Sequence, residues 1–336
     1  MIRSRCQPPE RGRFRTEGRK QTMTGVGPQG RTGLAALAAL AVCLAAFPAG
    51  AEAQERTQLG YGRLVTNDLI GSFRDRWRTG SISSSRVYGY GWDRQLPEQA
   101  GDLIELRLRG ELVAPVTLSN PAPADRPFAG ILSIGAHTHY RIDQTEVSFG
   151  ADIAVTGPQT GLSDLQTALH DTLGIASLSQ EARDNQIEDG VHPTVLVELG
   201  RSYDLGGTGQ LRPFVEAQAG LETFLRAGVD LQIGRIGTGD LMVREPVTGH
   251  RYRTIRNDKP GMSFVFGGDV ARVADSVLLP ESRGYTLSDT RNRLRAGVHW
   301  QGAKNSAFYG LTWLGEEFKA QTEGQIVGSL RLNFEF

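Results

Sequence analysis

The sequence predicts an all-β protein: a transmembrane antiparallel β-barrel of about twelve strands, with a short helix in an extracellular loop. Apolar and polar residues alternate with period two through most of the chain, as they do in strands with one apolar face. Several alternating segments reach ten or more residues, the length a tilted strand needs to cross a bilayer. Aromatic residues gather near the ends of the apolar faces, which is typical of interfacial girdles: Tyr88, Tyr90, Trp92, Tyr140, Trp300, Tyr309 and Trp313. A soluble periplasmic β-sandwich, with its apolar faces turned inward, is the alternative.

The first 53 of the 336 residues differ in character from the rest. Basic residues precede an apolar run, Leu34 to Phe47, and small residues follow it up to Ala53, so we expect a secretory signal peptide over 1–53. A start at Met23 would give this peptide an ordinary length. A buried apolar helix is the alternative interpretation of the run. The remainder, 54–336, is then the outer-membrane β-barrel domain.

Removing the signal peptide changes the composition. The whole chain has net charge +0 and two cysteines, Cys6 and Cys43, whereas 54–336 has 29 basic and 34 acidic residues and no cysteine. The resulting charge of −5 argues against a nucleic-acid partner. The lack of cysteine excludes disulfides, thiol catalysis and thiolate metal sites from the exported chain. No apolar run reaches about 18 residues, which excludes a membrane protein built of helices.

The alternating segments define the strands in order. In the segment 103–112, for example, Leu106 and Leu108 share one face, and Glu105 and Arg107 share the other. We expect strands near 58–66, 82–92, 102–114, 128–140, 144–156, 192–203, 210–219, 222–234, 262–273, 290–301, 305–316 and 323–336. The last strand ends on Phe336 and resembles the C-terminal signature by which the barrel-assembly machinery recognises outer-membrane barrels.

An even number of strands fixes the side of each loop. If both termini are periplasmic, the loops 67–81, 115–127 and 157–191 all lie at the extracellular end. A basic stretch is the exception among the long connections, because it falls on the periplasmic side: His250, Arg251, Arg253 and Arg256.

The loop 157–191 carries the strongest candidate for chemistry. Ser163 and Gln166 form a capping box, and Leu165, Leu169 and Leu173 make one stripe of a short helix that Gly174 would end. Gln166 and His170 are four residues apart and share the adjacent face. A histidine held on a helix at the barrel mouth can act as a general base near neutral pH. A surface histidine that only caps or solvates the loop is the alternative.

Other polar residues allow two interpretations each. Asn67 and Asp68 could polarise a carbonyl, orient a base or bind a cation, but both residue types also favour turns. Asp125 and Arg126 precede a strand, where such a pair typically forms a structural ion pair. His137 and His139 share one strand face, as metal ligands or simply as lumen histidines. The motifs of serine hydrolases, phosphate-binding loops and calcium loops do not occur.

Several motifs, taken in order, resemble the outer-membrane lipid A 3′-O-deacylase family. They are Thr66-Asn67-Asp68, Asp75-Arg76-Trp77-Arg78-Thr79-Gly80, Asp125-Arg126-Pro127-Phe128-Ala129-Gly130, Gly157-Pro158, Gln166 with His170 and Gly174 at intervals of four, and Asn185-Gln186-Ile187-Glu188. The resemblance covers most of the exported chain and is densest between residues 60 and 190.

The resemblance implies a twelve-stranded, monomeric barrel of the bacterial outer membrane that acts on lipopolysaccharide. Such enzymes remove the 3′-linked acyloxyacyl group of lipid A by calcium-dependent ester hydrolysis. In this chain His170 matches the base, Asn67 and Asp68 match residues that build the site and stabilise the oxyanion, and Thr79 matches the metal and substrate region. Gln166 would belong to that region, and Asp125, Arg126 and Gln186 would support the site nearby.

The sequence departs from the family pattern at two positions where calcium ligands are expected. Leu69 stands where many family members have a second acidic residue, and Ala176 stands near the expected acidic metal ligand. The calcium ligands therefore stay unassigned at this stage. A non-enzymatic barrel of the same fold, either a narrow pore or a scaffold, is the alternative function.

Overall fold

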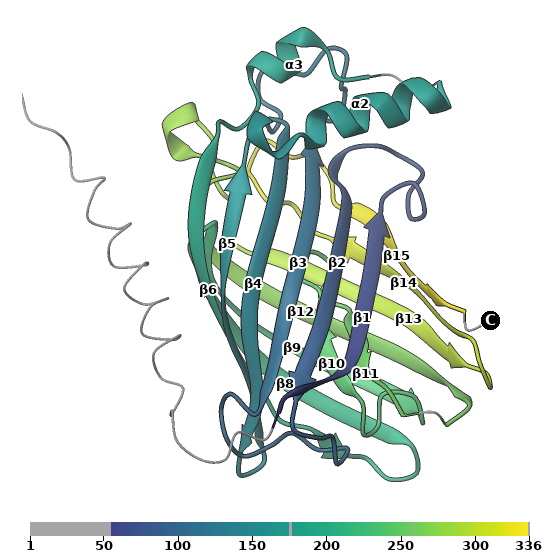
Figure 1. Cartoon of the computed structure of the whole chain (residues 1–336). Helices are drawn as coiled ribbons and strands as arrows, with labels where there is room; N and C mark the ends of the chain where they lie inside the picture. Colours follow the sequence, from purple (N-terminus) through teal and green to yellow (C-terminus); the bar gives the residue numbers. More distant parts are fainter. Residues whose placement is uncertain (1–54, 175–176, 258, 335–336) are drawn as a thin grey trace, which may run out of the picture.

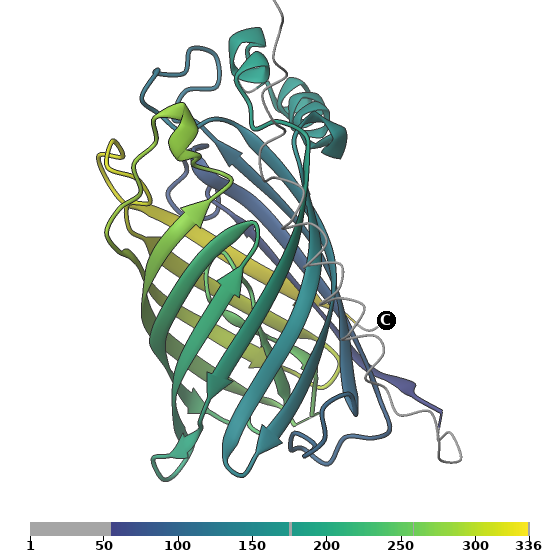
Figure 2. The same cartoon turned by 90° about the vertical axis from the view of Figure 1, so that its left-hand side faces the viewer.

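The protein is a closed antiparallel barrel of twelve strands (Figure 1). The computed structural model describes residues 55–174, 177–257 and 259–334. The wall strands are β1 (Thr57–Asn67), β2 (Trp77–Gly89), β3 (Leu103–Ala114), β4 (Ala129–Ile142), β5 (Thr145–Thr156), β6 (Gly190–Gly200), β8 (Gly209–Ala219), β9 (Glu222–Gly234), β12 (Gly261–Ser276), β13 (Arg291–Gln301), β14 (Ser306–Leu314) and β15 (Gln325–Asn333). Neighbouring strands pair antiparallel, and the β1–β15 and β6–β8 pairs close the ring. The strands are tilted, as Figure 2 shows, and the two-residue β7 (Tyr203–Asp204) pairs with β8.

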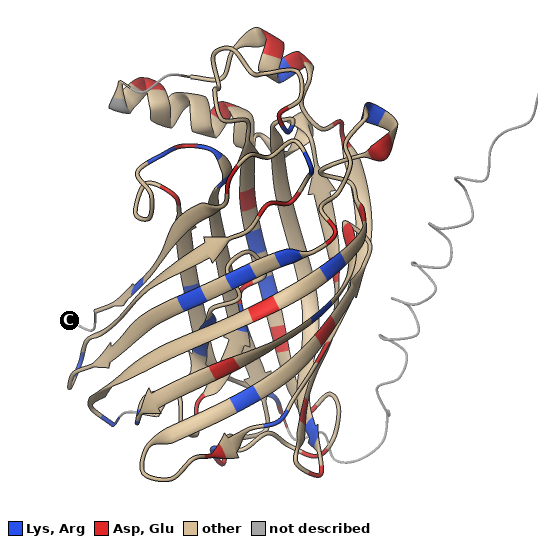
Figure 3. Ribbon diagram, turned by 180° about the vertical axis from the view of Figure 1, so that it is seen from behind, with Lys and Arg blue, Asp and Glu red and all other residues tan. Residues whose placement is uncertain are grey.

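The side to which the apolar residues of each strand point distinguishes a membrane barrel from a soluble sandwich. In β3, Leu106 and Leu108 are 48% and 57% exposed on the outer face, whereas Glu105 and Arg107 are buried inside. Charged residues recur at intervals along the strands (Figure 3). An apolar outside and a charged inside are what lipid on one face and a polar lumen on the other require. Trp92 departs from the expected girdle: it is half-buried and donates its indole N–H to the carbonyl of Gly239 at 3.0 Å.

Ion pairs satisfy many of the buried charges of the lumen. Glu105 accepts from Arg107 Nε at 2.8 Å and lies 2.7 Å from Nε2 of His139. His137 points to another carboxylate, Asp152, at 3.3 Å. The two histidines therefore behave as lumen residues with separate partners. Within the described ranges, no three His, Cys, Asp or Glu residues converge as metal ligands would.

The connection between β9 and β12 forms a hairpin inside the lumen. Its strands β10 (Leu241–Arg244) and β11 (Arg251–Ile255) pair with each other, and β11 packs against β1. An apolar cluster joins the hairpin to the wall: Leu64, Val87, Leu103, Leu241, Val243, Tyr252, Ile255 and Phe308. The basic stretch at 250–256 thus belongs to the predicted connection, but it lies within the barrel and not outside it. Its apolar residues Tyr252 and Ile255 pack against wall residues such as Leu64. We call β10 and β11 the inner hairpin.

The two ends of the barrel differ. One end carries the turns at 143–144 and 302–305, and such short turns face the periplasm in outer-membrane barrels. The other end carries η1 (Pro158–Thr160), α2 (Leu162–Leu173), α3 (Gln180–Asp184) and η2 (Glu281–Arg283). No helix among the described residues is long and apolar enough to span a membrane. The expected signal peptide, Ala176 and Phe336 lie outside the described residues.

Candidate active site at the extracellular rim

The loop between β1 and β2 is organised around the buried Asp68. Its side-chain Oδ2 accepts the backbone N–H of Arg76 at 2.7 Å, and its carbonyl accepts the N–H groups of Gly71 and Phe73. Phe73 and Trp77 have positive φ angles of 59° and 51°, a conformation that costs free energy for such side chains. These contacts and strained residues fix the loop so that Asp75 and Thr79 face the same space as Asp68.

Helix α2 brings His170 to this loop. The helix begins at Leu162 after Gly161, a left-handed N-cap that makes no side-chain cap bond, so the predicted capping box at Ser163 was wrong. Gly161 takes this place because its φ of 68° suits glycine, and Ser163 is already inside the helix. The predicted stop is confirmed, since the N–H of Gly174 donates to the carbonyl of His170. Gly130 of β4 lets the helix start pack closely, because a Cβ there would lie 3.0 Å from Cβ of Leu162.

A chain of contacts joins the two loops. Nε2 of His170 lies 3.1 Å from Oδ2 of Asp75. The other oxygen of Asp75 accepts the hydroxyl of Thr79, which also lies 3.4 Å from Oδ1 of Asp68. His170, Thr79 and Asp68 are all buried. The arrangement pairs a histidine with an orienting carboxylate, the pairing that general-base catalysis uses elsewhere.

The surroundings of Asp68 disfavour its charge. Burial raises the pKa of Asp68 to about 8, the backbone N–H of Arg76 opposes this shift, and the neighbouring Asp75 adds to it. A cation bound to the oxygen atoms of Asp68 would favour the ionised form.

Two further predicted residues flank these contacts. Asn67 ends β1, and its Oδ1 accepts the N–H of Leu69 at 2.8 Å, so its side chain forms an Asx turn. Gln166 lies on α2 one turn before His170 and is buried, and its Oε1 has no hydrogen-bond partner among the described residues. A buried amide oxygen without a partner is costly and is available to a donor on a bound molecule.

The three predicted supporting residues are spread around the rim. Asp125 accepts the indole N–H of Trp77 at 3.2 Å and the N–H of Val116 at 2.6 Å. Arg126 does not pair with the Asp125 carboxylate through its side chain; its Nη1 donates to Glu317, and only its backbone N–H donates to Asp125. The expected ion pair was therefore wrong, because Asp125 is already occupied in holding Trp77. Gln186 donates to the carbonyl of Arg183 at 2.8 Å.

The oxygen-rich donors partly fit a calcium ion. Asp68, Asp75 and Thr79 offer carboxylate and hydroxyl oxygen atoms, the ligands calcium prefers. Leu69 supplies no ligand atom from its side chain, and Ala176 lies outside the described residues. Further ligands would have to be backbone carbonyls, water or substrate oxygens.

Sequence reasoning did not assign a role to Asp75. It lies in the Asp75-to-Gly80 motif, but it is 95 residues before His170 in the sequence. The contact between the two side chains becomes visible only when the β1–β2 loop and helix α2 are seen together in the structure. Arg76 was also missed: its side chain is buried, stacks 4.3 Å from the ring of Trp77 and pairs with Glu323. The sequence signal that could have pointed to Asp75 was its position in the same short motif as Thr79, four residues before it.

Comparisons with known proteins found one family and several solved structures. A model of the family described as "Outer membrane protein LpxR" matches residues 36–336. The structure of LpxR from Salmonella typhimurium aligns with a TM-score of 0.66 and 17% identity, covering 82% of this chain and all of that one. The CymD monoaromatic hydrocarbon channel, at 12% identity and a TM-score of 0.35, covers 85% of this chain and 90% of its own. A search of curated proteins gave no match.

Proposed function

Because this chain belongs to the LpxR family of integral outer-membrane β-barrels, we propose that it is a lipid A deacylase that removes the 3′-linked acyloxyacyl group by ester hydrolysis. The contact between His170 and Asp75 is the observation that carries the proposal. It supplies a base and its orienting carboxylate at the extracellular rim, where lipopolysaccharide lies.

In the proposed reaction His170 takes a proton from a water molecule as the water oxygen attacks the ester carbonyl carbon. Asp75 holds the imidazole and stabilises its protonated form. When the ester C–O bond breaks, the same proton passes to the leaving sugar oxygen. The products are a carboxylic acid that keeps the acyloxy branch and a free 3′-hydroxyl group on lipid A. Gln166 is positioned one helical turn away to bind a polar group of the substrate.

Calcium is part of the proposal. Asp68 and Thr79 are the residues that would hold the ion, because both are buried and their side-chain oxygen atoms lie 3.4 Å apart. When bound, the ion would supply positive charge that polarises the ester carbonyl. Asn67 would then help to hold the end of β1 in place through its Asx turn.

Exposed apolar side chains beside the site suit a lipid substrate. Leu165 and Leu169 of α2 are 62% and 55% exposed, and Phe73 of the β1–β2 loop is 83% exposed. They lie at the end of the barrel where α2 stands above the wall (Figure 1). At the level of the outer leaflet such a surface would meet acyl chains.

The experiment is mass spectrometry of lipid A from cells that express the wild type, His170→Ala or His192→Gln. His192 is a rim histidine of β6 that bonds Thr156 at 2.9 Å and has no part in the proposed site, so it is the matched control. We expect loss of one acyloxyacyl group with the wild type and with His192→Gln, but not with His170→Ala. Unmodified lipid A with folded wild type and added calcium would refute the enzyme and favour a scaffold. A pore is disfavoured by the inner hairpin, which packs against the lumen wall.

A further inference from the structure

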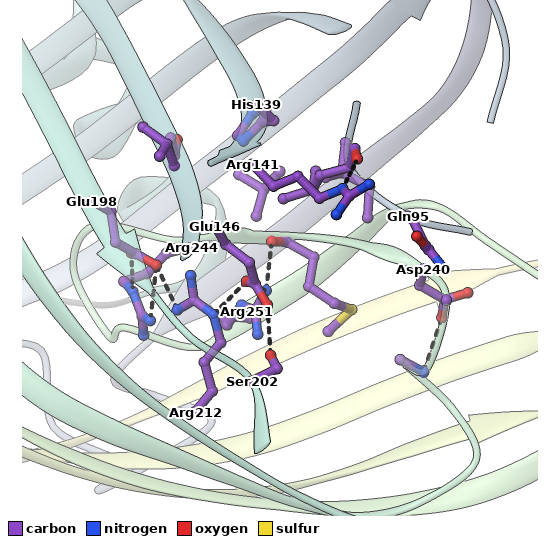
Figure 4. Close-up of a pocket in the computed structure, with 18 of the residues that line it drawn as sticks. Gln95, His139, Arg141, Glu146, Glu198, Ser202, Arg212, Asp240, Arg244 and Arg251 are labelled. Atoms are coloured by element: carbon purple, nitrogen blue, oxygen red, sulfur yellow. Dashed lines mark hydrogen bonds and ion pairs between the residues drawn. The ribbon is translucent and has the colours of Figure 1, made fainter. Parts of the chain in front are cut away.

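A cavity of about 370 Å³ opens at the end of the barrel that carries the periplasmic turns, opposite His170. Figure 4 shows residues that line it. Its lining comes from the periplasmic turns, including Gln144 and Ser202, from wall strands and from Met242 of the inner hairpin. The volume falls within the range of small-molecule sites. Because the hairpin and the lumen ion pairs lie between this cavity and the outer rim, a ligand would enter from the periplasm.

Charged residues line one side of the cavity, among them Arg212, Arg244, Arg251, Glu146 and Glu198 (Figure 4). Arg212 of β8 donates to Glu146 of β5 at 2.6 Å and to Glu198 of β6 at 2.7 Å, which ties three wall strands together. Arg244 of the inner hairpin donates to the other oxygen of Glu198 at 2.6 Å. Arg244 also reaches Asp230 at 2.8 Å, so both Arg212 and Arg244 are fully engaged.

Arg251 has weaker partners than Arg212 and Arg244. Its Nη2 lies 3.8 Å from Glu146, beyond hydrogen-bond distance, and donates to the carbonyl of Met242 at 3.3 Å. Its side chain is only 20% exposed, and it lines the cavity. Because Arg212 already holds Glu146 at 2.6 Å, the carboxylate nearest to Arg251 is engaged by another cation. A buried guanidinium favours a carboxylate or phosphate partner, which it can bind through two parallel hydrogen bonds.

The remaining lining is mixed. Leu96 and Leu196 offer apolar surface, whereas Gln210 and Gln232 offer amide groups. Arg141 is another lining cation; its Nε donates to the carbonyl of Leu96 and its Nη2 pairs with the exposed Glu98. The cavity therefore suits a compact molecule that carries both an anionic group and carbon atoms.

We propose that this cavity binds a small organic oxyanion from the periplasm, a carboxylate or a phosphate ester, with Arg251 at its charged group. The bound molecule would bridge the inner hairpin and the barrel wall. It would thereby stabilise the hairpin within the lumen. This site is independent of the proposed deacylase activity.

The test uses the full exported barrel in detergent, with citrate and glycerol 3-phosphate as probes and chloride at equal ionic strength as the reference. We expect isothermal titration to detect binding of at least one probe, and the Tm to rise by about 2 °C or more at saturation. The two probes distinguish a carboxylate ligand from a phosphate ligand. Arg251→Gln should weaken binding at least tenfold, the loss of about one charge-assisted hydrogen bond.

Arg235→Gln is the matched control, because Arg235 is an exposed cation of the same β9–β12 connection and does not line the cavity. It should bind as the wild type does. If Arg251→Gln does not fold, Arg141→Gln provides the second variant, with weaker binding expected. The absence of binding by the wild type to both probes, or equal affinity in the wild type and the folded variants, would overturn the proposal.

Discussion

Replacing Asp75 with Asn tests the part of the site that the sequence did not assign. In the proposed mechanism the carboxylate stabilises the protonated imidazole of His170, which forms only during the reaction. At the observed 3.1 Å, Coulomb's law with an effective dielectric constant of about 20 gives about 5 kcal/mol for two unit charges. Both charges are delocalised and Asn can still accept a hydrogen bond, so we expect a loss of about 3 kcal/mol, a decrease in kcat of roughly a hundredfold.

The assay follows the release of acyloxyacyl acid from purified lipid A by the barrel in detergent, with calcium present. Asp164→Asn is the matched control, because Asp164 lies on α2 but is 80% exposed and pairs with Arg183. It should keep wild-type kcat. A difference in gel migration between unheated and heated samples checks that each variant is folded. A folded Asp75→Asn protein with wild-type kcat would refute the role of the carboxylate.

Four other perturbations probe the site, the lipid contact and the lumen. Burial raises the pKa of Asp68 to about 8 in the folded protein, from 3.8 in the unfolded chain. The contribution of this group to stability is therefore complete below about pH 4 and is lost as the pH rises through 8. Asp68→Asn should raise the Tm relative to the wild type at pH 9 and have little effect on it at pH 4. Thr79→Val should lower activity about tenfold or more by leaving Asp68 and Asp75 without their shared hydroxyl, whereas Thr79→Ser should retain most of it, as measured by acid release. Leu169→Glu should reduce activity on lipid A in membranes but leave the gel migration unchanged, since the side chain is exposed on α2. Replacing the hairpin residues 241–255 with a short glycine-serine linker should raise ion conductance in planar bilayers, and unchanged conductance would contradict the account of the lumen.

The barrel was predictable because its signal is local. Each wall strand alternates with period two, and all twelve expected strands occur within a few residues of their predicted positions. The inner hairpin was not predictable by the same logic. Its short strands, such as Leu241–Arg244, have too few residues to show a period, and they are held by wall residues from distant segments, such as Leu64 and Phe308. Burial of this kind depends on closure of the barrel, which no local pattern encodes.

The candidate site was predictable in part for a related reason. Parity of the strands correctly brought the ends of β1 and β2 and the loop of α2 to one rim, and so placed Asp68, Thr79 and His170 near one another. The loop conformations decided the rest. The left-handed Trp77 and the Asp68 contacts turn Asp75 toward His170, and Asp125 accepts from the Trp77 indole and not from the Arg126 side chain. Such contacts depend on three-dimensional loop geometry that residue spacing does not determine.

Hydrolysis in ¹⁸O-labelled water tests the central claim most directly. Purified barrel, calcium and lipid A would be incubated in the labelled solvent, and the released acid and the remaining lipid A would be analysed by mass spectrometry. If His170 and Asp75 direct water to the ester carbonyl, one ¹⁸O atom enters the carboxyl group of the released acid and none enters the 3′-hydroxyl group. Release of an unlabelled acid, or equal release by His170→Ala, would contradict the account.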